Sequence, residues 1–231
     1  MGDLFLSLIG YSEFILKRGG VHMTELVFVL DRSGSMGGLE SDTIGGFNSM
    51  LEKQKKLDGK VFVTTILFDD RYEVLHDRVE LEHVKPLSHA DYFVRGMTAL
   101  LDAVGKTIAR VKSIDVSSKE KRQVLFVIMT DGLENASREY SYKTIKQRIN
   151  RLTSDASWEF IFLGANIDAV EVGSRFGMRE DKVVNYHADE AGVQLNYQVI
   201  SDAVTQYRET KEIGKNWKAK IDKDFKTRKK S

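Results

Sequence analysis

Residues 25–35 read Glu-Leu-Val-Phe-Val-Leu-Asp-Arg-Ser-Gly-Ser, and this stretch decides the fold. It opens with a short, almost continuously apolar run, which is typical of a β-strand buried on both faces of a sheet. The run ends at Asp31, and two hydroxyl side chains, Ser33 and Ser35, follow at alternate positions. Gly34 between them permits a tight turn. The stretch therefore predicts a buried strand whose carboxyl end carries three oxygen-bearing side chains.

The rest of the chain alternates between predicted strands and predicted helices. Apolar runs like the first occur at residues 61–68, 124–129 and 158–163, with a last, shorter edge strand at 182–186. The apolar spacing of a helix is found at residues 44–57, 100–111, 142–152 and 168–176, and from about residue 190 onward. This alternation indicates βαβ units and a mainly parallel sheet. Residues 72–81 follow the run at 61–68 too closely for a crossover helix, so we expect an antiparallel edge strand there.

Length and composition exclude several classes of protein. The chain has 231 residues, 35 Lys and Arg against 34 Asp and Glu, and no cysteine. The length suits one large domain or two small ones, and the lack of cysteine excludes disulfide scaffolds and thiolate zinc sites. No apolar run is long enough for a transmembrane helix, and the N-terminal residues lack the basic leader of a secretion signal, so we expect a cytoplasmic protein. Residues 1–22 are interpreted as an extension or a misassigned start, because Met23 opens the first strand.

Charge is divided unevenly along the chain. Residues 211–231 carry a net charge of +6, which leaves −5 on residues 1–210. Apolar residues recur every four positions in this basic tail, at Ile213, Trp217, Ile221 and Phe225. Two interpretations stay open: the tail is a helix docked on its own domain, or it offers a surface, with Trp217 as a contact, to an anionic membrane, nucleic acid or an acidic protein. We therefore divide the chain into an extension, a domain at 23–210 and a basic amphipathic tail.

Two further segments bring oxygen-bearing side chains to the same edge of the predicted sheet. Thr98 lies in a loop before a predicted helix, and Asp131, followed by Gly132, ends the strand at 124–129. In a parallel sheet, ligands gather at the carboxyl ends of strands, near the point where the strand order reverses. Ligand sets made only of oxygen suit hard cations, so these residues predict a site for Mg²⁺ or Mn²⁺. The five histidines are scattered without ligand spacing, which argues against zinc.

The order Asp-x-Ser-x-Ser, Gly-x-Thr and Thr-Asp-Gly resembles the metal-ion-dependent adhesion site of the von Willebrand factor type A family. The matching ligand positions are Asp31, Ser33, Ser35, Thr98 and Asp131. The resemblance covers about residues 25–207, and residues 130–136 are similar to the bacterial intracellular branch of the family. It implies a Rossmann-like, three-layer α/β fold, with a six-stranded, mainly parallel sheet, one antiparallel edge strand, and helices on both faces.

The resemblance also implies a role for each ligand position. Ser33 and Ser35 would bind Mg²⁺ or Mn²⁺, in preference to Ca²⁺, directly, and Thr98 would bind it directly or through water. Asp31 and Asp131 would act mostly through water and hydrogen bonds. A cation with few charged direct ligands stays electrophilic and can exchange a water for a partner's carboxylate. We therefore expect a non-catalytic module that binds a protein partner through an Asp or Glu of that partner.

Neighbouring residues receive supporting roles, and other functions stay open. Gly34, Gly132, Glu134 and Asn135 are expected to shape the site loops, and Arg32 to be exposed or to meet an acidic partner at the rim. One alternative function is a subunit of a chelatase-like or tellurite-resistance and stress-response assembly that works with an ATPase. A Mg²⁺-dependent phosphatase ranks lower, because Ser33 stands where such enzymes carry a second Asp. A membrane or nucleic-acid accessory that acts through the tail also ranks lower.

Overall fold

The computed structural model describes residues 22–114, 121–154 and 157–228. Residues 1–21 of the predicted extension lie outside the described residues. The sheet consists of β1 (His22–Asp31), β2 (Val61–Phe68), β3 (Tyr72–Glu80), β4 (Lys121–Thr130), β5 (Trp158–Ala165) and β6 (Val183–Tyr186). The six strands lie in the order β3-β2-β1-β4-β5-β6. β3 runs antiparallel to β2, and every other pair is parallel. The predicted antiparallel edge strand is confirmed.

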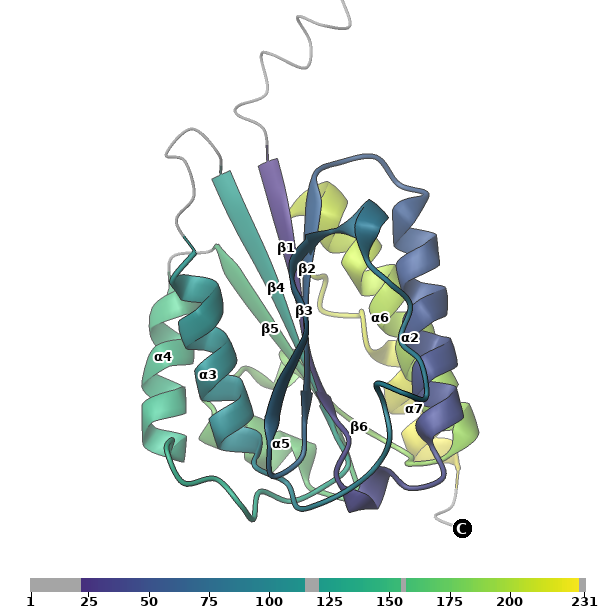
Figure 1. Ribbon diagram of the computed structural model, residues 1–231, viewed down its shortest axis with the longest axis vertical. Coiled ribbons are helices and arrows are strands. Elements are labelled where there is room, and N and C mark those ends of the chain that lie inside the picture. Colours follow the sequence, from purple (N-terminus) through teal and green to yellow (C-terminus); the bar gives the residue numbers. More distant parts are fainter. Residues whose placement is uncertain (1–21, 115–120, 155–156, 229–231) are drawn as a thin grey trace, which may run out of the picture.

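Helices cover both faces of this sheet (Figure 1). They are α2 (Glu40–Lys55), α3 (Leu100–Lys112), α4 (Tyr142–Ser154), α5 (Ala169–Arg175), α6 (Glu190–Thr210) and α7 (Ala219–Thr227). Short 3₁₀ turns lie at η1 (Gly34–Met36), η2 (Leu81–His83) and η3 (Glu180–Lys182). One face is covered by α3, α4 and α5, and the other by α2, α6 and α7 (Figure 1). The predicted Rossmann-like three-layer α/β fold is therefore confirmed.

The core explains why the first strand is apolar almost without interruption. Successive side chains of a strand point to opposite faces, and in β1 both faces are buried. Val27 and Val29 belong to the apolar cluster under α3, α4 and α5. Leu26, Phe28 and Leu30 belong to the cluster under α2, α6 and α7. Since both faces lie under helices, an alternating polar pattern would bury polar side chains.

The topology places the carboxyl ends of β1 and β4 side by side at the centre of the sheet. From β1 the chain builds β2 and β3 on one side, and then crosses back to pair β4 with the other side of β1. Leu30 lies opposite Met129 in this pair, and Asp31 lies opposite Phe68 of β2. The strand order reverses at this point, which is where open α/β sheets bind ligands.

The basic tail does not form the single helical stripe that its spacing predicts. α7 begins only at Ala219, so Ile213 and Trp217 lie in the turns that precede it. Lys211 ends α6 in the left-handed conformation, with φ of 65°. This backbone reversal breaks the helical repeat between α6 and α7. The prediction is wrong for the first half of the tail because it assumed one continuous helix.

The described part of the tail packs against its own sheet. Ile213 and Ile221 are buried and belong to the core under α2 and α6. The indole Nε1 of Trp217 donates to the backbone carbonyl of Asp181 at 2.7 Å. Lys218 Nζ donates to a carbonyl of β6 at 2.7 Å. Trp217, which the sequence suggests as a partner contact, is therefore half-buried and bonded to its own chain.

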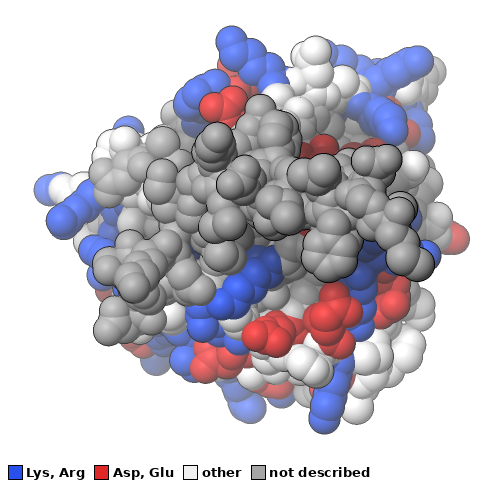
Figure 2. Space-filling model, turned by 90° about the horizontal axis from the view of Figure 1, so that it is seen from above, with Lys and Arg blue, Asp and Glu red and all other residues white. Residues whose placement is uncertain are grey.

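The edge opposite the carboxyl ends of β1 and β4 carries both signs of charge. On the part of this face that is visible, Lys and Arg side chains are mixed with Asp and Glu side chains (Figure 2).

Within the described ranges, no helix is both long enough and apolar enough to span a bilayer.

Candidate functional site

The structure brings the five predicted ligand residues together at the carboxyl ends of β1 and β4. Thr98 Oγ1 donates to Ser33 Oγ at 3.0 Å, and Ser33 Oγ lies 3.2 Å from Ser35 Oγ. Ser35 Oγ in turn donates to Oδ1 of Asp131 at 2.5 Å. Ser35 is exposed, whereas Asp31 and the other three are buried. The cluster therefore opens to solvent above Ser35.

Asp31 organises the turn that carries the two serines. Its Oδ1 accepts a hydrogen bond from the amide of Ser33 at 2.7 Å, and its Oδ2 accepts one from Thr130 Oγ1 at 2.5 Å. The phenol of Tyr92 donates to the Asp31 carbonyl at 2.5 Å. Burial raises the pKa of Asp31 to about 6, although the bonds from Thr130 and Ser33 oppose this. Our sequence interpretation did not assign a role to Thr130 or Tyr92.

Asp131 has one carboxylate oxygen that is free to accept a hydrogen bond or to bind a cation. Its Oδ2 is buried and has no hydrogen-bond partner among the described residues. Burial raises the pKa of Asp131, and the bond from Ser35 lowers it by a smaller amount. A buried carboxylate oxygen without a donor is costly unless a cation or a proton compensates it. This atom is therefore suited to a positive ion.

Gly132 lies beside the hydroxyl cluster, and a side chain at this position would point into the cluster. A Cβ at this position would lie 2.7 Å from Thr98 Oγ1 and 3.1 Å from Ser35 Oγ. It would lie 3.5 Å from Ser33 Oγ. Any larger residue at position 132 would therefore fill the space between these three hydroxyl groups.

Glu134 and Asn135 hold the loop that carries Thr98. Asn135 Oδ1 accepts a hydrogen bond from the backbone N–H of Thr98 at 2.8 Å. The backbone N–H of Asn135 donates in return to the Thr98 carbonyl at 3.0 Å. Glu134 Oε2 accepts the amide of Leu101 at 2.9 Å, in the first turn of α3. The first amides of a helix lack partners within the helix, and a carboxylate there also suits the helix dipole. These two residues therefore position Thr98 and the start of α3.

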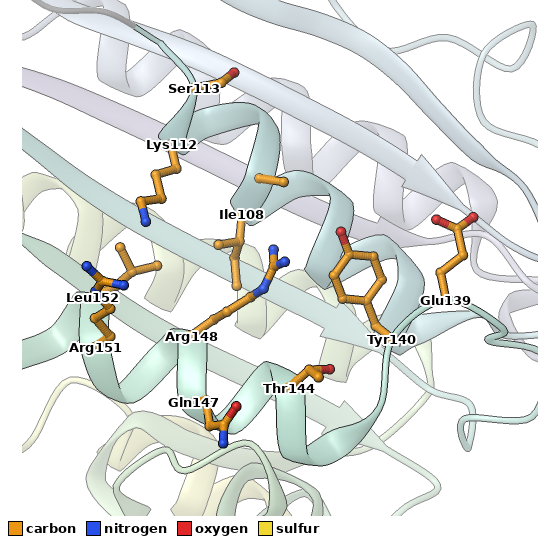
Figure 3. Close-up of a pocket in the computed structure, with 11 residues that line it drawn as sticks. Ile108, Lys112, Ser113, Glu139, Tyr140, Thr144, Gln147, Arg148, Arg151 and Leu152 are labelled. Atoms are coloured by element: carbon orange, nitrogen blue, oxygen red, sulfur yellow. The ribbon is translucent and has the colours of Figure 1, made fainter.

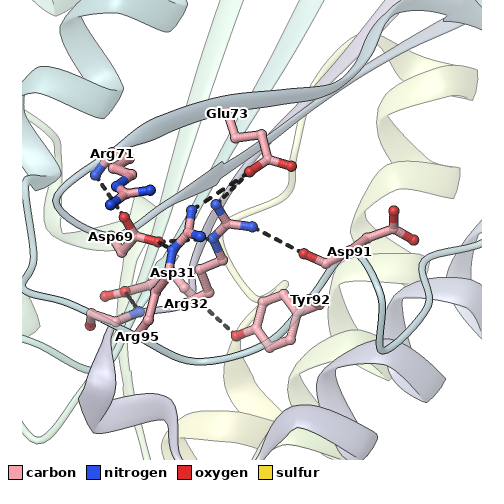
Figure 4. A network of polar contacts seen from close by, with 9 residues as sticks. Asp31, Arg32, Asp69, Arg71, Glu73, Asp91, Tyr92 and Arg95 are labelled. Atoms are coloured by element: carbon pink, nitrogen blue, oxygen red, sulfur yellow. Dashed lines mark hydrogen bonds and ion pairs between the residues drawn. The ribbon is translucent and has the colours of Figure 1, made fainter.

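The structure contradicts the expectation that Arg32 is exposed at the rim. Arg32 is fully buried, with its Nε 3.0 Å from Asp69 Oδ2 and its NH2 2.6 Å from Glu73 Oε2 (Figure 4). Its NH1 also donates to the carbonyl of Asp91 at 3.0 Å. The side chain points away from the hydroxyl cluster, toward Asp69 and Glu73. Arg32 therefore joins β1 to the start of β3 and to the loop at 84–99.

Asp69 and Arg95 complete this ion-pair network. Asp69 is fully buried and its Oδ2 accepts from Arg95 Nε at 2.7 Å. Burial acts to raise the pKa of Asp69, but the bonds from Arg95, the Arg71 amide and Arg32 outweigh it and lower that pKa. Asp69 follows β2 directly, as Asp31 ends β1. Asp69 is thus a third carboxylate at the end of a buried strand, besides Asp31 and Asp131, and the sequence interpretation assigned it no role.

A larger pocket lies away from this cluster. It has a volume of about 1010 Å³ and lies between α3 and α4, where Lys112, Arg148 and Arg151 surround apolar side chains such as Ile108 (Figure 3). None of the predicted ligand residues lines it. Among the described residues, no group of three or more His, Cys, Asp or Glu side chains is placed to hold a metal.

Comparisons with known proteins identify the fold. No protein-family model matches the chain, and no curated protein shows significant similarity to it. Among solved structures, proximal thread matrix protein 1 from the mussel byssus has a TM-score of 0.54 and 14% identity, over 79% of this chain and 46% of that one. BatB from Bacteroides thetaiotaomicron has a TM-score of 0.50 and 13% identity, over 81% and 100% of the two chains.

The ArnB paralog VWA2 from Sulfolobus acidocaldarius also matches, with a TM-score of 0.50 and 20% identity, over 80% of this chain and 45% of that one. The chain thus spans about half the length of the mussel protein and of VWA2. At such low identities the likeness establishes the fold alone. That fold is the Rossmann-like α/β fold of von Willebrand A-type proteins.

Proposed function

We propose that this protein is a non-catalytic binding module that holds Mg²⁺ or Mn²⁺ at the hydroxyl cluster and uses it to bind a carboxylate of a partner protein. The observation that carries the proposal is the buried Oδ2 of Asp131, which lacks a partner in the described chain beside three clustered hydroxyls. Ser33, Ser35 and Thr98 would provide neutral oxygens to the ion. Asp31 would hold the Ser33 amide, and Asp131 would balance charge.

The spacing of the oxygens supports a small octahedral ion. Neighbouring ligands of Mg²⁺ lie about 3 Å apart, because each is about 2.1 Å from the ion. The observed oxygen separations are 3.0 Å for Thr98 and Ser33, and 3.2 Å for Ser33 and Ser35. Ca²⁺ prefers longer bonds, of about 2.3–2.6 Å, and more ligands. These separations are compatible with an ion of the size of Mg²⁺ or Mn²⁺, and a set of oxygen ligands suits such hard cations.

The same geometry favours binding over hydrolysis. A bound divalent ion supplies an electrophile that an anionic group can reach above the exposed Ser35. Asp31 is unsuited to attack a phosphoryl group, because it is buried and both of its carboxylate oxygens accept hydrogen bonds. The proposal is compatible with a role beside an ATPase, which would use the same site. Copurification with an ATPase distinguishes that role from binding to other proteins.

Calorimetry with the full chain tests the metal site. We expect Mg²⁺ and Mn²⁺ to bind with one ion per chain, and Ser33→Ala to weaken binding by about tenfold or more. Mg²⁺ at about 100 times its dissociation constant should raise the free energy of unfolding by about 2.7 kcal/mol. Ser49→Ala is the matched control, because Ser49 is exposed on α2. Absence of Mg²⁺ and Mn²⁺ binding, or equal binding by Ser33→Ala and Ser49→Ala, would refute the proposal.

Mg²⁺ binding is expected to weaken as the pH falls below about 6. The pKa of Asp31 is raised to about 6 and that of Asp131 is also raised, so protons compete with the cation at lower pH. Between pH 7 and pH 5 the affinity should fall by about tenfold. Calorimetry at the two pH values measures this change. Equal affinities at pH 5 and pH 7 would contradict it.

The stability of the metal-free protein should change in the opposite direction. The unfolded Asp31 carboxyl titrates near its usual pKa of 3.8 and the folded one near 6, so the folded state binds the proton more tightly. Stability in EDTA therefore falls as the pH rises through this window, by about 3 kcal/mol from this group. Denaturant unfolding of wild type and Asp31→Asn at pH 4 and pH 7 isolates the contribution. A similar pH dependence in both proteins would exclude Asp31 as its source.

A further inference from the structure

Large apolar side chains are exposed in the loops that carry Thr98 and Asp131. Among the described residues, five large hydrophobic side chains are exposed, and three of them lie in the loops that carry the site. Phe93 is 43% exposed, Met97 is 53% exposed and Leu133 is 63% exposed. Met97 precedes Thr98, and Leu133 follows Gly132. Apolar groups gathered at one functional edge are typical of a protein-binding surface.

Met97 and Leu133 each lie next to a residue that takes part in the hydrogen bonds of the site loops. Thr98, next to Met97, is bonded through both its amide and its carbonyl to Asn135. Leu133 is held on its other side by Glu134, which is fixed to the start of α3. Met97 and Leu133 are thus exposed next to residues that hydrogen bonds hold in the site.

Leu133 also borders a pocket beside the cluster. This pocket has a volume of about 620 Å³, within the range of about 300–1,000 Å³ that is usual for ligand sites. Leu133, Ile167, Tyr186 and Phe225 form its apolar side, and the rest is lined by polar side chains, namely Asn166, Asp168, Asn185, His187 and Asp189. Tyr186 also lines the small space behind Asp31, so the pocket and the hydroxyl cluster are neighbours.

The C-terminal tail completes this pocket. Phe225 comes from α7, and its ring lies 4.8 Å from the ring of His187, which follows β6. Arg228 fixes the end of α7 by pairing with Asp189 at 2.7 Å. The tail thus contributes an apolar wall near the site, in addition to covering the core.

We infer that the partner presents a large apolar side chain within a few residues of its acidic residue, and that this side chain enters the pocket between Leu133 and Phe225. The inference rests on the proposed function. Neutral Ser33, Ser35 and Thr98 leave a bound cation in need of an anion, which the partner's carboxylate complements. Apolar contacts beside that carboxylate exclude water and strengthen the ionic contact, because the local dielectric falls. The partner segment is therefore both acidic and apolar.

The test uses the full chain and a synthetic library of seven-residue peptides with a central Asp. Flanking positions carry either Leu, Phe or Trp, or Ser, Gly or Gln, and retention is measured in Mg²⁺ and in EDTA. We expect apolar flanks to be enriched in Mg²⁺. Leu133→Ser and Phe225→Ala should each weaken binding of the selected peptide by about tenfold, as expected for one lost apolar contact. Both should keep the wild-type Mg²⁺ affinity by calorimetry.

Leu57→Ser is the matched control, because Leu57 is exposed after α2, at the opposite edge of the sheet. It should bind the selected peptide like wild type. Since Leu133 is exposed, Leu133→Ser is expected to remain folded even if Phe225→Ala loosens α7. Retention of Asp peptides in Mg²⁺ without an apolar preference, or unchanged binding by Leu133→Ser, would overturn this inference and leave the proposed function standing. Intact Mg²⁺ binding with no Asp peptide retained would overturn both carboxylate binding and this inference.

Discussion

Replacing Gly132 with alanine is expected to weaken Mg²⁺ binding by at least about 100-fold while the fold is retained. The added methyl group would lie 2.7 Å from Thr98 Oγ1 and 3.1 Å from Ser35 Oγ, so it would fill the space that the hydroxyls share. Gly132 does not have a positive φ, and alanine can adopt its backbone conformation. Rotation of Thr98 would relieve the contact, but would also move a proposed ligand away. Calorimetry with Mg²⁺ and denaturant unfolding in EDTA measure the two effects separately.

Gly45→Ala is the matched control for this substitution. A Cβ at Gly45 meets no atom within 4 Å, and the residue lies inside α2. Alanine there should stabilise the protein by about 0.5–1 kcal/mol through helix propensity, with no effect on Mg²⁺ affinity. If Gly132→Ala bound Mg²⁺ with wild-type affinity, the ion would have to bind elsewhere on the molecule.

Replacing Arg32 with leucine is expected to lower the free energy of unfolding by about 3–5 kcal/mol. The loss arises because Asp69 stays fully buried and, within the described ranges, keeps only Arg95 as an ion-pair partner, whose side chain is 31% exposed. The Asp91 carbonyl loses a donor as well. Removal of one partner of a buried pair costs more than the pair itself contributes, since the remaining charge stays out of water. Denaturant unfolding in EDTA measures the change without a contribution from metal.

Arg179→Leu tests whether burial is the cause. Arg179 pairs with Asp181 at 2.5 Å, but its side chain is 69% exposed. An ion pair in contact with solvent contributes at most about 1 kcal/mol, because water and salt screen it. If Arg32→Leu were no more destabilising than Arg179→Leu, the buried network would not be a major source of stability.

Local patterns in the sequence were sufficient for most of the fold. The apolar run before Asp31 predicts a strand buried on both faces, and β1 is buried on both faces. The short connection before residue 72 predicts an antiparallel edge, and β3 lies at that edge. Where a regular spacing did not correspond to one element, as in the tail, the prediction was wrong. A spacing of four residues does not reveal the left-handed residue at Lys211 that ends α6.

The sequence by itself determined the alternation of strands and helices, and it identified which oxygen-bearing side chains end the central strands. These features depend on neighbours a few residues apart. Only the tertiary structure decided that Arg32 turns inward to Asp69, that Glu134 supports the first turn of α3, and that the tail builds a pocket wall with Phe225. These contacts join residues more than thirty positions apart in the chain. The strand order sets which loops meet, and no local spacing contains that information.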